Sequence, residues 1–202
     1  MNKTELKKQK KRSALYQTAF DLFTSQGITR TTISDIVQAA GVAKGTFYLY
    51  FKDKYDIRNK LIAHKAGELL CQAHEAILRE RIQGFEARIH FLVDHVLDRL
   101  ENDPSLMAFI YKNLSWGIFI DLFEEKDTDD SYSFKNAYED LLSQEDAGFY
   151  DDPELLLFSI LELVSGTGYS CIVDKKPIPL SRFRPYLHRC IDGILESFRN
   201  PS

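Results

Sequence analysis

Residues 41–54 read GVAKGTFYLYFKDK, and this stretch decides the fold. Its centre, residues 46–51, is rich in residues that favour β-strands, and taken alone it has the composition of a buried strand. On a helix, however, Phe47 and Phe51 lie four residues apart and share one face, while Leu49 lies opposite them. We therefore interpret the stretch as a short helix with one buried apolar face, because tertiary packing overrides strand propensity in so short a segment.

The residues before this stretch also have helical patterns. An apolar stripe within residues 15–23 predicts an amphipathic helix, which Gly27 ends. Thr32 followed by Asp35 has the spacing of a capping box and predicts a short helix over residues 33–40. Two short helices behind a longer one predict a helix-turn-helix unit, whose second helix lies in the major groove of DNA.

The rest of the chain is also predicted to be helical. Asp53 and Asp56 repeat the start signal, and Asp-Pro pairs precede two later helices. Further helices are predicted over residues 53–81, 85–102, 104–123 with a break near 116–117, 131–144, 153–173 and 181–198, with an acidic loop at 124–130 and a turn at 175–179. The expected fold is all-α with about nine helices, divided into a DNA-binding domain (1–56) and a larger domain (57–202).

Charge is distributed unevenly along the 202 residues. Residues 1–54 carry ten Lys or Arg against four Asp or Glu, whereas the remainder carries sixteen against twenty-six. A basic module joined to an acidic body suggests that the module meets a polyanion. A solvated basic tail would explain the N-terminal lysines but not the composition of residues 41–54.

The expected DNA-binding face combines small, hydroxyl-bearing and basic residues. Gly45 lets the backbone approach DNA, Leu49 offers an apolar contact to a thymine methyl, and hydroxyls and ammonium groups reach bases or phosphates. The predicted contact residues are Thr31, Thr32, Lys44, Gly45, Thr46, Tyr48, Leu49, Tyr50 and Lys54. An ordinary core helix would explain the two phenylalanines but not this opposite face.

Over residues 13–57 the sequence resembles the TetR family of bacterial transcription regulators. The resemblance is carried by Leu15, Ala19, Leu22, Phe23, Gly27, Thr31, Thr32, Ile33, Ile36, Ala40, Gly41, Val42, Lys44, Gly45, Thr46, Tyr48, Tyr50, Phe51 and Lys54. Ala43 stands where the family often has serine, and Ile57 replaces a frequent leucine. The resemblance implies an all-helical homodimer, paired through its last two helices, that releases a DNA operator when a small effector binds the larger domain.

Residues can be assigned to these two expected functions. Glycines within the helix over residues 153–173 suggest close packing, and the last helix has an apolar stripe. The proposed dimer interface is Leu161, Val164, Gly168, Phe183, Leu187, Cys190, Ile191, Ile194 and Phe198. The proposed effector pocket is Phe91, His95, Phe109, Tyr111, Trp116, Phe119 and Tyr138, which suits a hydrophobic or aromatic ligand, although any one aromatic residue here is more often plain core than ligand wall.

Other classes of function have little support. No histidine pair has metal-ligand spacing, no nucleophile-base or phosphate-loop motif is evident, and we expect no metal, no cofactor and no enzymatic activity. The apolar window at 105–123 contains Lys112, which disfavours a membrane span, and three scattered cysteines fit a reducing cytoplasm. The alternative to an effector-responsive repressor is an architectural DNA-binding protein without a ligand, whose binding hardly depends on sequence.

Overall fold

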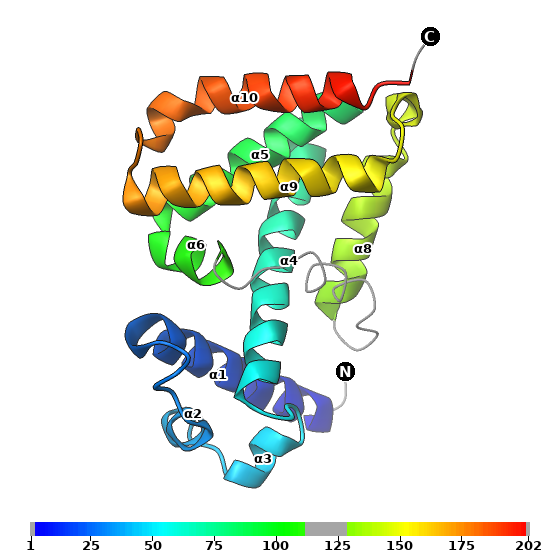
Figure 1. Ribbon diagram of the computed structural model, residues 1–202. Coiled ribbons are helices and arrows are strands. Elements are labelled where there is room, and N and C mark those ends of the chain that lie inside the picture. The colour runs from blue at the N-terminus through cyan, green and yellow to red at the C-terminus, as the bar shows by residue number, and fades with distance from the viewer. Residues whose placement is uncertain (1–2, 112–128, 201–202) are drawn as a thin grey trace. The chain divides into compact units, whose positions relative to one another are not determined.

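The computed structural model describes residues 3–111 and 129–200, which form α-helices and short connections (Figure 1). These ranges contain nine α-helices, one 3-10 helix and one π-helical segment. The only β-type pairing within the same residues is an antiparallel bridge between Tyr150 and Arg199. The all-α fold class predicted from the sequence is confirmed.

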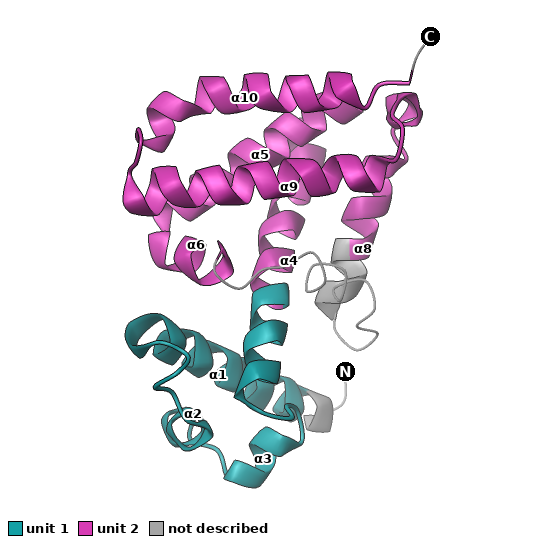
Figure 2. Cartoon of the chain, in the orientation of Figure 1, with its two compact units in different colours: residues 1–63 teal, residues 64–202 magenta. Residues whose placement is uncertain are grey.

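The chain divides into two compact units, residues 1–63 and 64–202 (Figure 2). The division falls inside helix α4 (Lys54–Glu80), so this helix contributes residues to both units. The sequence placed the boundary after residue 56, near the start of the same helix. The first turns of α4 instead group with the N-terminal unit, as far as Ala63.

The N-terminal unit contains α1 (Lys3–Gln26), α2 (Ile33–Ala39) and α3 (Lys44–Tyr48). The apolar stripe of α1 is buried, with Leu15 and Ala19 fully enclosed. The helix ends at Gly27, whose φ of 85° lies in the left-handed region that glycine adopts without a Cβ clash. These elements match the predicted helices closely.

Side-chain caps fix the starts of α2 and α4. The Thr32 hydroxyl accepts a hydrogen bond from the Asp35 backbone N–H at 3.1 Å, and Asp35 accepts one from the Thr32 N–H at 2.8 Å. These hydrogen bonds hold the pKa of Asp35 below its ordinary value. Asp53 caps α4 in the same way by accepting from the Asp56 N–H at 2.9 Å. Both predicted start signals are present in the structure.

The C-terminal unit contains the remainder of α4 together with the later helices. These are α5 (Phe85–Asn102), α6 (Pro104–Tyr111), α8 (Asp129–Leu142), the 3-10 helix η1 (Glu145–Phe149), α9 (Pro153–Tyr169), the π-helical segment η2 (Ser170–Asp174) and α10 (Leu180–Ser197). Helices α9 and α10 lie side by side and run in opposite directions (Figure 1). Two details differ from the sequence prediction: residues 129–130 belong to α8 rather than to a loop, and residues 170–174 are π-helical.

Part of the predicted helix over residues 104–123 cannot be compared. Its first part corresponds to α6, whereas its continuation and the expected break near residues 116–117 lie outside the described residues. The same holds for Trp116 and Phe119, two residues of the predicted pocket.

Two backbone hydrogen bonds tie the end of α10 to the segment after η1. The Asp151 N–H donates to the Phe198 carbonyl and the Asn200 N–H to the Phe149 carbonyl, both at 2.8 Å. Tyr150 lies between Phe149 and Asp151 in the sequence. Its burial and the hydrogen bond that it donates to Glu86 raise its pKa to about 12. The C-terminal unit is thereby closed by the last residues that the structure describes.

Candidate functional site

The helix predicted from residues 46–51 is anchored by its two phenylalanines. Phe47 is fully buried and Phe51 nearly so, with their ring centroids 5.4 Å apart. The Tyr16 ring of α1 lies 5.3 Å from that of Phe51. A turn containing Gly41, at φ 66°, joins α2 to α3 and gives the helix-turn-helix arrangement.

The opposite face of α3 is open to solvent, as the helical interpretation requires. Leu49, which follows the last residue of α3 and keeps helical dihedral angles, is 79% exposed, and Tyr48 is 53% exposed. Lys44 and Gly45 are exposed too, and a Cβ at Gly45 would meet no atom within 4 Å. Leu49 and Tyr48 thus present adjacent apolar and aromatic surface to solvent on this short helix.

Three predicted DNA-contacting residues have different roles in the structure. Thr31 is fully buried, and its hydroxyl donates to the Gly27 carbonyl at 2.9 Å, so a phosphate contact by this hydroxyl is excluded. The Thr32 hydroxyl is engaged in the capping box with Asp35. Lys54 donates to the carbonyls of Ile28, Thr29 and Thr31, at 3.0, 3.2 and 3.1 Å. The sequence did not indicate that these side chains are hydrogen-bonded within the protein, to backbone carbonyls and to Asp35.

Thr46 and Tyr50 lie at the margin of the exposed face. Both side chains are half-buried, and the Tyr50 hydroxyl lies 3.4 Å from the Lys8 carbonyl oxygen. The Tyr50 ring packs near Phe51, with centroids 6.2 Å apart. The residues of the predicted set that remain available on the surface are therefore Lys44, Gly45, Tyr48 and Leu49, with Thr46 and Tyr50 at their edge.

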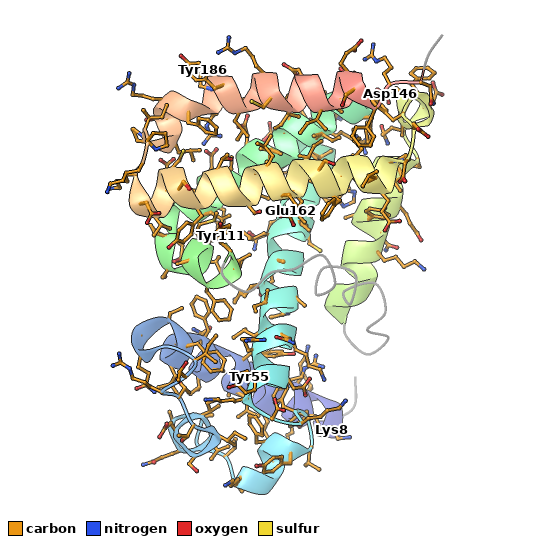
Figure 3. All side chains as sticks on the ribbon, in the orientation of Figure 1. Lys8, Tyr55, Tyr111, Asp146, Glu162 and Tyr186 are labelled. Atoms are coloured by element: carbon orange, nitrogen blue, oxygen red, sulfur yellow. The ribbon has the colours of Figure 1, made fainter. Side chains whose placement is uncertain are left out.

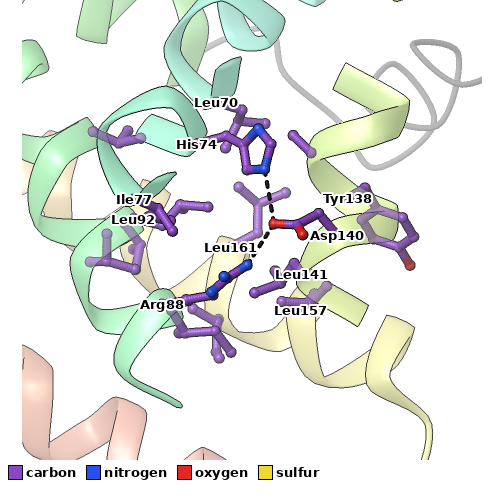
Figure 4. Close-up of a pocket in the computed structure, with 16 residues that line it drawn as sticks. Leu70, His74, Ile77, Arg88, Leu92, Tyr138, Asp140, Leu141, Leu157 and Leu161 are labelled. Atoms are coloured by element: carbon purple, nitrogen blue, oxygen red, sulfur yellow. Dashed lines mark hydrogen bonds and ion pairs between the residues drawn. The ribbon is translucent and has the colours of Figure 1, made fainter. Parts of the chain in front are cut away.

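A cavity of about 140 Å³ lies inside the C-terminal unit (Figure 4). Its walls come from α4, α5, α8 and α9, and most of the lining side chains are aliphatic. They include Leu70, Ile77, Leu92, Val93, Leu157 and Ile160. Tyr138 of α8 is the predicted pocket residue that lines this cavity.

The residues of the aromatic pocket predicted from the sequence lie in different surroundings, and Trp116 and Phe119 lie outside the described residues. Phe91 and His95 stack on one another with centroids 6.0 Å apart, and neither lines a described cavity. Phe109 is buried in the core. Tyr111 stacks on Tyr169, with centroids 4.4 Å apart, and lines a second cavity of about 80 Å³. The aliphatic faces of four helices meet at the cavity, which no local sequence pattern indicates.

Three charged or polar side chains interrupt the aliphatic wall of the first cavity. His74 Nε2 lies 2.9 Å from Asp140 Oδ2, and Arg88 Nη1 lies 2.5 Å from the same oxygen. Arg88 is nearly buried and also donates through Nε to the Ile82 carbonyl at 3.0 Å. Burial by itself would raise the pKa of Asp140, but the hydrogen bonds and charges of His74 and Arg88 bring it below its ordinary value.

Several residues of the predicted dimer interface are buried within the protomer. Leu187 and Ile191 are fully buried, and a Cβ at Gly168 would lie 3.1 Å from Leu97. Leu161 and Val164 line the cavities. Leu187, Ile191 and Gly168 are therefore buried in the protomer, whereas Leu161 and Val164 are half-buried. Phe183, Cys190, Ile194 and Phe198 remain wholly or partly exposed.

Helices α9 and α10 also leave apolar surface uncovered. The stretch Pro153–Asp174 is long and apolar enough to cross a membrane by length and composition alone, and 28% of its 18-residue apolar window is buried within the protomer. Leu155 on α9 is exposed. Glu162 on α9 and Tyr186 on α10 are exposed too (Figure 3). Gly166 and Gly193, one on each helix, have open space where a Cβ would stand.

Histidines that are far apart in sequence meet across α5 and α10. His90 Nδ1 lies 2.6 Å from His188 Nδ1, and the two Nε2 atoms lie 2.8 Å from Asp192 and 3.0 Å from Asp94 respectively. Within the described residues there is no group of three or more His, Cys, Asp or Glu side chains that could hold a metal ion. These contacts fasten α10 to α5.

Taken together, the three-helix unit and the exposed face of α3 define a helix-turn-helix DNA-binding protein. The sequence pattern described as bacterial regulatory proteins of the tetR family matches residues 15–61. An uncharacterized HTH-type transcriptional regulator, YvdT, of Bacillus subtilis is 33% identical over 104 residues, which cover 50% of this chain and 51% of that protein. The fatty acid metabolism regulator protein of the same organism is 36% identical over 70 residues, or 35% of this chain and 36% of that protein.

Solved structures extend the similarity to nearly the whole chain. FadR from Bacillus subtilis in complex with stearoyl-CoA has a TM-score of 0.61 and 17% identity, covering 89% of this chain and 96% of that one. A TetR transcriptional regulator from Rhodococcus sp. RHA1 has a TM-score of 0.64 and 15% identity, covering 94% and 97%. At these identities the similarity shows the fold alone.

The chain therefore carries, in residues 15–61, the DNA-binding domain of the TetR family of bacterial transcription regulators. Its sequence match spans about half the length of YvdT, and less of the other relative. Members of this family are transcription regulators rather than enzymes, which agrees with the expectation that the chain is not an enzyme.

Proposed function

We infer that the chain is a cytoplasmic transcriptional repressor that binds a two-fold symmetric DNA operator as a homodimer and releases it when a small effector binds. The observation that carries this inference is the exposed face of α3, where Tyr48 and Leu49 project from a helix held by buried Phe47. Such a helix can enter the major groove, with Leu49 against a thymine methyl and Tyr48 and Lys44 at phosphates.

A homodimer is supported by the uncovered surface of α9 and α10. The long apolar stretch Pro153–Asp174 is only partly buried in the protomer, and a second copy would supply an equivalent apolar surface to cover it. The glycines at 166 and 193 leave space for two backbones to approach closely. A dimer also doubles the number of base pairs read, at half-sites about 34 Å apart.

A small effector is supported by the cavity in the C-terminal unit. A partly open, largely aliphatic cavity with a few polar groups has the character of a ligand site. FadR from Bacillus subtilis, which has a similar fold, was solved with stearoyl-CoA, a ligand with an aliphatic chain. The lining therefore favours an aliphatic effector over the aromatic one considered from the sequence.

Selection of DNA from a random pool by the full-length protein tests the assignment. We expect one palindromic motif, together with a salt dependence of log affinity of about −0.9 per phosphate neutralised. Leu49→Ala is expected to change the selected bases. Leu78→Ala removes another exposed leucine, from the C-terminal part of α4, and serves as the matched control. Binding that follows salt but selects no motif would instead support the architectural alternative.

A further inference from the structure

Three helices direct polar side chains to one point of the first cavity (Figure 4). His74 of α4 and Arg88 of α5 both approach Oδ2 of Asp140 on α8, at 2.9 and 2.5 Å. A carboxylate can only accept hydrogen bonds, so both nitrogens are donors here. Two donors from different helices thus converge on a single anionic oxygen.

This arrangement is not needed to fill the space. A buried ion pair costs desolvation energy, and apolar side chains of similar volume are often as stabilising or more so. The surrounding walls are leucine, isoleucine and valine, yet the Arg88 side chain is only 7% exposed. Arg88 and His74 therefore have the character of a site that recognises a carboxylate, and in this structure the Asp140 side chain supplies that carboxylate.

The aliphatic surface extends away from this point into a second cavity. The first cavity has a volume of about 140 Å³ and the second about 80 Å³. They share Leu70, Val96, Leu161 and Val164, so these four side chains form the wall between them. A cavity of about 150 Å³ is enough to hold benzene. With movement of the shared side chains, the two spaces suit a chain of about six to ten carbons.

We propose that the effector is a medium-chain aliphatic carboxylate whose carboxylate replaces Asp140 as the partner of Arg88 and His74, while its chain occupies the two cavities. Arg88 remains paired throughout, because one carboxylate is exchanged for another. The exchange frees α8 from its polar attachment to α4 and α5. The role of this ligand as an effector rests on the proposed function, whereas its binding does not.

Calorimetry on the full-length protein tests the ligand class with three probes of equal chain length: octanoate, 1-octanol and octylamine. We expect octanoate to bind at least about tenfold more tightly than the other two, because charge-assisted hydrogen bonds form only with the carboxylate. Equal or tighter binding of octanol or octylamine, or no binding of octanoate, would overturn the proposal.

A double variant separates anion recognition from folding. Removing Asp140 alone leaves the Arg88 charge buried, whereas Arg88→Met combined with Asp140→Leu removes both charges and replaces them with apolar side chains. We expect this variant to unfold at a temperature close to that of the unmodified protein, to lose octanoate binding at least about tenfold, and to retain octanol. Unchanged octanoate affinity in the folded double variant would place the carboxylate elsewhere and contradict the proposal.

The same samples separate this inference from the proposed function. Operator DNA is added to the unmodified protein with and without octanoate, and DNA binding is followed by fluorescence anisotropy. If octanoate binds by calorimetry but does not release the operator, the ligand class stands and the effector role fails. If no operator is bound at all, the proposed function fails while the calorimetric result remains valid.

Discussion

The ammonium group of Lys54 lies 3.0 Å from the carbonyl oxygen of Ile28. It also donates to the carbonyls of Thr29 and Thr31, so one side chain at the start of α4 closes the connection between α1 and α2. The sequence suggested that Lys54 binds the DNA backbone. The geometry shows instead that its charge holds the helix-turn-helix unit together from within.

Lys54→Met is expected to destabilise the N-terminal unit by about 2 kcal/mol, because three carbonyls, two of them in part-buried hydrogen bonds, lose a charged donor. Urea unfolding followed by circular dichroism measures this change. Lys44→Met is the matched control: its side chain is exposed, so we expect weaker operator binding with stability changed by less than about 0.5 kcal/mol. A Lys54→Met protein as stable as the unmodified one would contradict the internal role.

Tyr48→Phe is expected to weaken operator binding about fivefold, since one hydrogen bond to a phosphate contributes about 1 kcal/mol. The loss should be similar on all DNA sequences, because a phosphate contact carries no base information. Tyr55→Phe removes a hydroxyl of comparable exposure from the same unit and should leave affinity unchanged. Fluorescence anisotropy with operator and unrelated DNA makes the comparison, and equal effects of the two substitutions would argue against the contact.

Gly166→Leu tests the dimer through a site that the isolated protomer tolerates. A Cβ at Gly166 meets nothing within 4 Å, and leucine favours a helix over glycine by about 1 kcal/mol. We therefore expect a stable protein that has become monomeric, as measured by light scattering. Ile194→Glu should also give monomers, whereas charge at the fully buried Ile191 should unfold the protomer. A dimeric Gly166→Leu protein would place the interface on another surface.

Asp140→Asn is expected to lower stability at neutral pH by about 1–3 kcal/mol, less than for a fully buried pair because Asp140 is 34% exposed. The pKa of Asp140 is lowered from 3.8 in the folded protein, so the native state binds fewer protons than the unfolded state around that pH. The contribution of the carboxylate is therefore complete above pH 3.8 and is lost as pH falls through the folded pKa. Urea midpoints of the two proteins should converge on acidification, and a constant difference would contradict this.

Local patterns in the sequence predicted most of the fold. The Thr32–Asp35 capping box, the Asp53 cap and the glycine at position 27 act within a few residues of their own position, so their geometry follows from the sequence. The inward face of α3 followed from the four-residue spacing of Phe47 and Phe51.

The site depends on contacts that no local pattern contains. His74, Arg88 and Asp140 come from three helices, and only the tertiary structure brings them to one cavity. The apolar residues of α10 could not be divided between core and interface, since Leu187 and Ile194 are equally apolar in sequence but differ in exposure. Thr31 was misassigned for the same reason: its partner is a carbonyl of the preceding turn.

The continuity of α4 across residues 63 and 64 has a consequence for how this protein can be recombined. Where two units are joined by a coil, a linker can lengthen by a residue with little effect. Here an inserted residue would turn every later side chain of the helix by about 100° relative to the earlier ones, whereas seven inserted residues would nearly restore the original phase. In chimeras that take the DNA-binding unit from a relative, we therefore expect the helical register at the junction, and not the length of α4, to decide whether the protein functions.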